Sequence, residues 1–593
     1  MIFEKHINRY YIKYAYMLII GLLTLGMVDW LQLLVPNLYQ MVINGLNQGY
    51  VVVQGQQIPY DMEFVVSRIC MPMTGIIIGI LFGRFIWRIC FFGAAIRVET
   101  SLRDRMFDNA RRLNRDYYQV NKVGSLMSLF TNDLDTVQDC YGWGIMMFFD
   151  ALMLSTLSIS KMWRMNSRLT LLSMIPMAFL LAASTLVGRY MMKKWDERQE
   201  CFARLSDFSQ ESFSGIAVVK AFVKQARELW AFRDLNKQNE KAQVEYTKAS
   251  VLLRILVTCF VESTICLILG FGGYLVYQDV FNAGQLIEFL GYFTTVVWPI
   301  MAVAELVDMT SRGQASMKRI AEMLEAKPTV VDRAGAKPLE EPHGDIAFRH
   351  LNFTYPDGET AALQDISFTI HAGENVGLVG RTGSGKSTLV DLILRTYNVP
   401  DGSLFIDGQD VNDLTIASVR KACAYVPQDN FLFSDTIENN IGFGVAQQDE
   451  AAVSHAARMA DIHDNIMEFG AGYETVLGER GVTVSGGQKQ RISIARALMK
   501  DAPILILDDS VSAVDTRTEQ NILHNLSEER AGRTTILIAH RISTIARMDK
   551  LLFLEDGRLT AAGTHTQLYE TCPAYRRMVD LQRLEEEGEV QNA

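Results

Sequence analysis

The sequence predicts an α-helical domain with six membrane spans, followed by an α/β domain built around a phosphate-binding loop. Three observations predict this fold class. The chain of 593 residues exceeds the size of one domain, and long apolar stretches occur throughout its first 310 residues. Short apolar strands alternate with helices beyond residue 343. One of those strands runs into Gly380–Ser387, which fits the phosphate-loop pattern G-x-x-x-x-G-K-[ST].

Six apolar stretches are each long enough to cross a bilayer, which takes about 20 mostly apolar residues. They cover residues 16–38, 64–95, 141–163, 167–189, 249–277 and 286–310. The alternative is a set of buried helices in a soluble core, but such helices are rarely this long or this uninterrupted. We therefore expect a transmembrane domain over residues 1–325.

The distribution of Lys and Arg predicts which side each loop faces. Segments 39–63 and 278–285 contain neither residue, whereas 96–140 contains seven and 190–248 contains eleven. We expect the N-terminus, the two long loops and the α/β domain in the cytosol, with the chain in the cytoplasmic (inner) membrane. The turn 160–168 is an exception, because it places three basic residues on the predicted outer side.

The two long loops carry apolar residues at helical spacing, with a break near the tip of each. Short helices are expected there, over residues 115–120 and 215–222. From spacing alone, they are either plain surface helices or helices that dock on the soluble domain.

Charged residues inside the spans are costly, so they usually line a cavity or pair with one another. Asp29, Asp150 and Glu262 are candidates for contact with a cationic or amphipathic cargo. The alternative is pairing with Arg84 or Arg88, and the sequence leaves the choice open.

Composition excludes several other classes of function. The net charge of −10 argues against a nucleic-acid-binding surface. The eight cysteines form no C-x-x-C motif, which argues against zinc and disulfide roles.

A polar linker is expected over residues 326–342 and an α/β domain over 343–593. The expected strands are 346–354, 365–371, 374–379, 402–407, 423–426, 503–508, 534–538 and 550–555.

The phosphate loop has the residue types that its chemistry needs. Glycines let the backbone turn several N–H groups toward one anion, and the helix that follows adds its positive end. Lys386 would reach the β- and γ-phosphates, and the Ser387 hydroxyl would bind Mg²⁺. The predicted phosphate-contacting residues are Gly380, Arg381, Thr382, Gly383, Ser384, Gly385, Lys386, Ser387 and Thr388.

A second motif is the apolar strand Ile504–Leu507, which ends in two carboxylates. Asp508 would hold Mg²⁺ opposite Ser387. Asp509 stands where a general base for the attacking water is needed. The alternative is a buried strand that ends in a polar turn, which the upstream loop makes a poor explanation.

A third motif precedes the predicted helix 489–498 and comprises Ser485, Gly486, Gly487 and Gln488. Serine and glycines at a helix start form an anion site, or simply an N-cap. A single nucleotide hardly needs two such sites from one chain. The motif is therefore interpreted as serving a nucleotide held by a second subunit.

Together these motifs resemble the ABC exporter superfamily, as a type IV half-transporter most similar to multidrug-resistance-like subunits of the MdlA type. The resemblance implies that ATP and Mg²⁺ are bound, that Tyr355 stacks on adenine, and that Gln428 senses Mg²⁺. It also implies that His540 is the switch histidine and that Ser485 to Gln488 form the signature motif, with Val484 in place of the usual leucine. It further implies that the two short helices at the loop tips are coupling helices, which dock on the soluble domain.

One departure from the family pattern concerns catalysis, because the usual base after Asp508 is glutamate and here it is Asp509. A carboxylate set back by ~1 Å can cost about a hundredfold in rate. We therefore expect a degenerate site that hydrolyses ATP slowly, in a heterodimer whose partner carries the catalytic Glu. The expected activity is efflux of small lipophilic or amphipathic compounds from a lipid membrane. The alternatives are a nucleotide-locked regulatory pseudo-ATPase subunit and a homodimeric lipid flippase.

Overall fold

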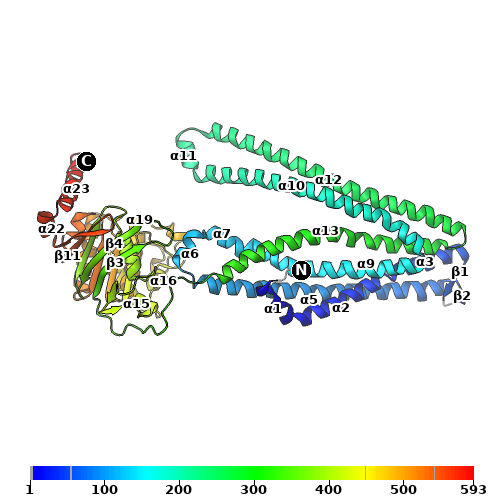
Figure 1. Ribbon diagram of the computed structural model, residues 1–593, viewed down its shortest axis with the longest axis horizontal. Coiled ribbons are helices and arrows are strands. Elements are labelled where there is room, and N and C mark those ends of the chain that lie inside the picture. Colours follow the sequence, from blue (N-terminus) through cyan, green and yellow to red (C-terminus); the bar gives the residue numbers. More distant parts are fainter. Residues whose placement is uncertain (1–3, 54–55, 448, 540, 593) are drawn as a thin grey trace. The chain divides into compact units, whose positions relative to one another are not determined.

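The structure, a computed structural model, describes residues 4–53, 56–447, 449–539 and 541–592 (Figure 1). It contains two compact units. Unit 1 comprises Met1–Arg111 and Asn121–Ala326, and unit 2 comprises Arg112–Val120 and Lys327–Ala593. A nine-residue piece of the first long loop is therefore part of unit 2, although the chain on both sides of it belongs to unit 1.

The six predicted membrane spans are confirmed as helical stretches long and apolar enough to cross a bilayer. In the described part of the chain they are Ala15–Gln48, Met62–Ala110, Val123–Met165, Ser167–Ser214, Gln225–Tyr277 and Ala283–Glu325. The named helices are α2 (Ala15–Gln32), α3 (Val35–Gln48), α5 (Met71–Ala110), α9 (Ile145–Met165), α10 (Ser167–Ser214), α12 (Gln225–Tyr277) and α13 (Ala283–Glu325). The 53 residues of α12 measure ~80 Å, far more than the ~30 Å of a bilayer core. The long loops are thus largely helical extensions of the spans.

The N-terminal segment forms α1 (Lys5–Lys13), which packs against the rest of unit 1. His6, Ile7 and Tyr10 are buried in it. The hydroxyl groups of Tyr10 and Ser101 lie 2.8 Å apart. The apolar side of this helix is therefore covered by protein.

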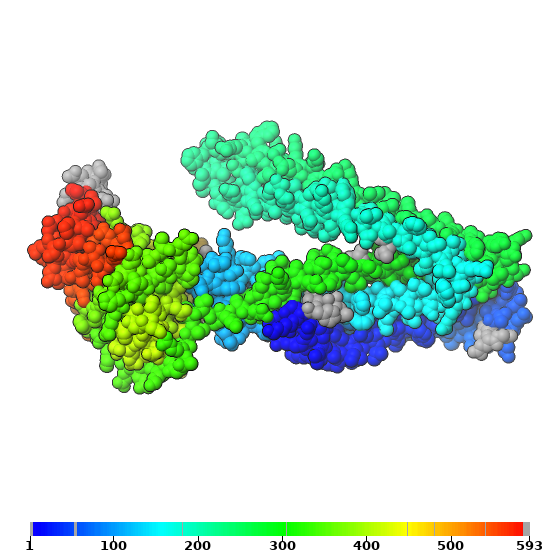
Figure 2. Space-filling model, viewed as in Figure 1, coloured from blue at the N-terminus to red at the C-terminus, as the bar shows by residue number. Residues whose placement is uncertain are grey.

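Both expected tip helices are present, as α6 (Arg115–Val120) and α11 (Ile216–Ala221). Helices α10 and α12 pack along each other and diverge from α5, α9 and α13 toward α11 (Figure 2). Around α11, the side chains of Val218 and Phe222 are exposed. The loop between the first two spans contains a hairpin, β1 (Tyr50–Val53) with β2 (Gln56–Pro59), which the sequence did not predict.

Unit 2 contains a six-stranded sheet in the order β12-β11-β5-β10-β9-β8 and a four-stranded antiparallel sheet in the order β4-β3-β6-β7. Their strands are β3 (Ile346–Thr354), β4 (Ala361–Ile370), β5 (Asn375–Gly380), β6 (Leu404–Ile406), β7 (Gln409–Asp410), β8 (Cys423–Val426), β9 (Ile504–Asp508), β10 (Thr534–Ile538), β11 (Lys550–Glu555) and β12 (Arg558–Gly563). All eight predicted strands are present, whereas β7 and β12 were not predicted. Strands β5 and β8 to β11 run parallel, so their carboxyl ends meet at one edge of the sheet.

Candidate nucleotide site

The phosphate loop joins the end of β5 to α14 (Lys386–Ile393). Gly380 has φ +152° and Gly385 has φ +98°, both in the region that favours glycine. A Cβ on Gly380 would lie 2.2 Å from the Leu554 carbonyl oxygen, and one on Gly385 would lie 2.5 Å from Leu363 Cδ2. Only glycine fits at either position, so the tight curvature of the loop follows from its sequence. Arg381, Thr382 and Gly383 are exposed at its crest.

Lys386 lies inside this loop, with only 7% of its surface exposed. Its Nζ donates to the carbonyl oxygens of Gly380 at 2.8 Å and Arg381 at 2.9 Å. Burial lowers the pKa of Lys386, while the nearby charges of Asp508 and Asp509 oppose that shift. The buried Ser384 Oγ has no hydrogen-bond partner among the described residues. A buried ammonium group and an unpaired hydroxyl within a curved loop fit a phosphate chain.

The predicted metal-binding pair is brought together at the same edge of the sheet. Ser387 Oγ donates to Asp508 Oδ1 at 3.3 Å. Asp508 is 3% exposed and ends β9, which is separated from β5 by β10 alone. Hydroxyl and carboxylate oxygens are ligands that Mg²⁺ prefers, so the pair fits that ion.

Gln428 follows the end of β8, the strand next to β9. The parallel register places Val426 opposite Leu507, so Gln428 emerges beyond the same edge as Asp508 and is exposed. The predicted switch histidine, His540, lies outside the described residues.

Asp509 is held by its backbone just after β9. Its φ is +47°, in the left-handed region that Asp and Asn tolerate better than most residues. Its N–H donates to the Ile538 carbonyl at 2.9 Å, and its carbonyl accepts from Ser512 Oγ at 2.9 Å. The side chain is half-buried. Two hydrogen bonds therefore hold the backbone of Asp509 in place directly after β9.

Tyr355, the predicted adenine-stacking residue, lies beside the start of α14. Its hydroxyl and Thr388 Oγ1 are 2.8 Å apart, and its ring meets the Tyr397 ring edge-on with centroids 5.2 Å apart. The Tyr397 hydroxyl donates to Gln119 Oε1 of α6 at 3.3 Å. An aromatic pair therefore connects the phosphate-loop helix to α6.

A second contact between α14 and α6 is the ion pair of Arg115 with Asp391, at 3.1 Å. Burial raises the pKa of the Asp391 carboxyl, and the Arg115 charge opposes that shift. Neither Asp391 nor Tyr397 was predicted from the sequence as a site residue. No local pattern marks them, because their partners lie about 280 residues earlier in the chain, as the separation of 276 for Arg115 and Asp391 shows.

The predicted signature motif begins α19 (Gly486–Met499). Ser485 is the N-cap, and its side chain forms a reciprocal capping box with Gln488. Gly486 is exposed, whereas a Cβ on Gly487 would lie 2.9 Å from the Ala513 carbonyl oxygen. Among the described residues, no hydrogen bond joins this helix start to the phosphate loop.

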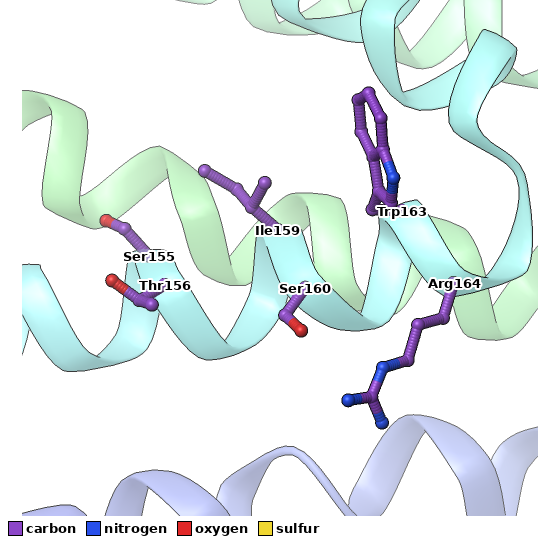
Figure 3. A pocket seen from close by; sticks show the side chains of 6 residues that line it. All are labelled: Ser155, Thr156, Ile159, Ser160, Trp163 and Arg164. Carbon is purple, nitrogen blue, oxygen red and sulfur yellow. The ribbon is translucent and has the colours of Figure 1, made fainter.

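A cavity of about 490 Å³ lies along α9 in unit 1. Its wall includes Ser155, Thr156, Ile159 and Ser160, with Trp163 and Arg164 one turn further on, where they point to opposite sides of the helix (Figure 3).

Both parts of the chain match families of known proteins. Residues 18–300 match the family described as "ABC transporter transmembrane region", and residues 363–512 match "ABC transporter". The chain is 33% identical to the "Probable multidrug resistance ABC transporter ATP-binding/permease protein YheI" of Bacillus subtilis (strain 168), over 97% of this chain and 96% of that one. It is also 33% identical to the "Multidrug resistance-like ATP-binding protein MdlA" of Escherichia coli (strain K12), over 95% and 93% of the two chains.

A solved structure of a bacterial Atm1-family ABC exporter with ATP bound has a TM-score of 0.78 and 26% identity, and the match covers 96% of this chain and 99% of that one. The relatives and the solved structure thus match this chain across both its spans and its phosphate-loop domain. The chain belongs to the ABC transporter family, as an exporter half-transporter in which a six-span transmembrane domain is fused to a nucleotide-binding domain.

Proposed function

We propose that this chain is one half of a heterodimeric exporter of small lipophilic or amphipathic compounds in the cytoplasmic membrane. Its own site, built on Lys386, Ser387 and Asp508, binds ATP with Mg²⁺ but hydrolyses it slowly. Its signature helix α19 completes the competent site of the partner, which carries a glutamate base. The observation that supports the proposal most is that Asp509 directly follows β9. It lies beside Asp508, which is within hydrogen-bonding distance of Ser387.

The geometry supports some of the proposed roles, and the family resemblance implies the others. Lys386 is already buried and would exchange its two carbonyl contacts for the β- and γ-phosphates. Ser387, Asp508 and Gln428 would surround Mg²⁺, and Tyr355 would stack on adenine, as the family resemblance implies. His540 would sense the γ-phosphate. We further propose that residues 326–342 act as the linker between the domains 1–325 and 343–593.

The proposal is tested by purifying the chain alone and together with candidate sister half-transporters. The pair is expected to copurify and to hydrolyse ATP rapidly, whereas the chain alone binds ATP but shows little ATPase activity. Vigorous hydrolysis by the chain alone would contradict the proposal and favour a homodimeric exporter.

Lys386→Ala tests how far transport by the complex depends on nucleotide bound at this site. In the complex, we expect the substitution to weaken ATP binding at this site and to slow transport severalfold without abolishing it. Binding of a fluorescent ATP analogue and ATP-driven dye uptake into inverted vesicles measure the two effects. Complete loss of efflux with normal assembly would instead indicate that the site is essential to every transport cycle.

We propose that α6 transmits nucleotide binding through the ion pair of Arg115 with Asp391. Arg115→Ala removes the partner of a mostly buried carboxylate, and we expect about a fivefold lower ratio of dye exported to ATP hydrolysed, within the usual range of coupling energies. Arg111→Ala is the matched control, because Arg111 pairs with Asp108 on its own helix. Equal loss in both variants would contradict a specific role for Arg115.

A further inference from the structure

Helix α1 carries a row of basic side chains on the side that faces away from the rest of unit 1. This basic row consists of Lys5, Arg9 and Lys13, which follow one another at intervals of four residues and are all exposed. Residues at that spacing lie on one face of a helix. Ile7 and Tyr10 lie on the opposite face and are buried. The packing of the apolar face therefore turns the basic row outward.

Contacts beneath the basic row fix α1 to two long helices of unit 1. The Arg105 guanidinium of α5 donates to His6 Nδ1 at 3.0 Å. In the neutral ring, Nε2 then carries the proton, and it lies 3.1 Å from Oε1 of Glu325 at the end of α13. The Tyr141 hydroxyl also donates to the Tyr10 carbonyl oxygen at 3.1 Å. A ligand of the basic row would meet a helix that is already ordered, which lowers the entropy cost of binding.

The basic row lies beside the start of the first membrane span. That span, Ala15–Gln48, begins two residues after the end of α1. Ile12 is 83% exposed, and Tyr16, about one turn further on, is 57% exposed. Exposed tyrosines are typical of the boundary between headgroups and acyl chains. Because we expect the N-terminus in the cytosol, this boundary belongs to the cytosolic leaflet.

A further cation reaches the same level from α5. Arg97 follows the apolar stretch 64–95 and is exposed. Its Nη1 donates to the Tyr16 hydroxyl at 3.1 Å, and α5 packs along α2. The guanidinium group of Arg97 is therefore held at the end of the span where α1 joins α2.

Most of the positive charge on this surface has no acidic partner. Lys5 Nζ lies 3.9 Å from Glu325 Oε1. The charged groups of Arg9 and Lys13 instead lie over tyrosine rings of α1, at 4.7 and 5.2 Å from the ring centres. In the part of the chain that the structure describes, neither of them forms an ion pair, and neither does Arg97. Unpaired cations at a cytosolic membrane surface attract the anionic lipids of that leaflet.

We propose that Arg9, Lys13 and Arg97 bind the headgroup phosphate of an anionic phospholipid in the cytosolic leaflet. Ile12 and the lipid-facing side of α2 would contact its acyl chains. A zwitterionic lipid is disfavoured because these side chains repel its headgroup cation, and free phosphate is disfavoured because it lacks acyl chains. The inference rests on the proposed cytosolic placement of the N-terminus, and it requires neither a partner subunit nor a cargo.

Native mass spectrometry of the full chain in a neutral detergent tests the site. The probes are dioleoylphosphatidylglycerol and dioleoylphosphatidylcholine, which share their acyl chains. We expect the wild type to prefer phosphatidylglycerol. Arg9→Gln combined with Lys13→Gln should weaken phosphatidylglycerol binding about twentyfold, and Arg97→Gln alone about fivefold, at a factor of about five per cation. Binding of phosphatidylcholine and of ATP should remain as in the wild type, which shows that the variants are folded.

The matched control removes the same charge at the other end of the spans. Lys161→Gln combined with Arg168→Gln neutralises two exposed cations near the turn that joins α9 to α10, and should leave phosphatidylglycerol binding unchanged. Equal loss in the two double variants, or no loss in the α1 variant, would overturn the site. Displacement of the lipid by millimolar inorganic phosphate would overturn the assignment to a phospholipid. Because the measurement uses no ATP hydrolysis and no partner, its failure would leave the proposed export function standing.

Discussion

Replacing Asp509 by glutamate is expected to raise ATP hydrolysis by the purified chain about a hundredfold. In a preparation of this chain alone, two copies would supply each other's signature motif, so the base is the one catalytic part that departs from the family pattern. The backbone of Asp509 is already held by Ile538 and Ser512, and one added methylene would bring the carboxylate ~1 Å closer to the attacking water. Phosphate release at saturating ATP and Mg²⁺ measures the gain.

Asp509→Asn is the matched control for this experiment. Asparagine keeps the side-chain length and tolerates the left-handed backbone at φ +47°, but it cannot accept a proton. We expect it to show no gain and to bind ATP normally. If Asp509→Glu binds ATP normally and yet hydrolyses it no faster than the wild type, the short side chain is not what limits the site.

Gly486→Asp is expected to lower the ATPase activity of the heterodimer by about 10² or more, comparable to the loss of a key electrostatic contact. The substitution should leave the fold intact, because a Cβ at Gly486 meets nothing within 4 Å and an acidic residue at the start of α19 suits the helix dipole. In the assembled pair, however, its carboxylate would face the nucleotide phosphates of the partner. Steady-state ATPase of the copurified complex measures the loss.

Gly486→Ala separates charge from size in the same position. It adds a methyl group without charge and should retain most of the activity. Because the substituted residue belongs to this chain and the affected site to the partner, the result also tests which subunit hydrolyses ATP. Near-normal ATPase in Gly486→Asp would contradict the assignment of α19 to the partner's site.

Much of the fold follows from local sequence patterns. The central strands of unit 2 are covered on both faces, so they read as continuous apolar runs such as Ile504–Leu507, and the sequence predicted them. Strand β12 escaped prediction because it lies at the sheet edge, where its residues alternate between exposed and half-buried. The hairpin of β1 and β2 was not predicted from the sequence, because its polar second strand shows no apolar alternation.

The candidate site was predictable only in part, because some of its residues belong to no local sequence motif. Lys386, Ser387 and Asp508 belong to short motifs whose spacing reflects their chemistry, and the structure brings them together. Tyr355 came from family resemblance, since a lone tyrosine carries no such signal. The contacts of Asp391 and Tyr397 with α6 depend on tertiary packing that no local pattern encodes.

The length of α12 has a mechanical consequence. The stretch from Gln225 to Lys248 precedes the apolar part of the helix and reaches ~36 Å beyond it at 1.5 Å per residue. A tilt of about 5° within the bilayer would swing the far end by ~3 Å, roughly the length of one hydrogen bond. Paired with α10, this arm acts as a lever with α11 at its tip. Small rotations among the spans are thereby magnified into larger displacements of α11.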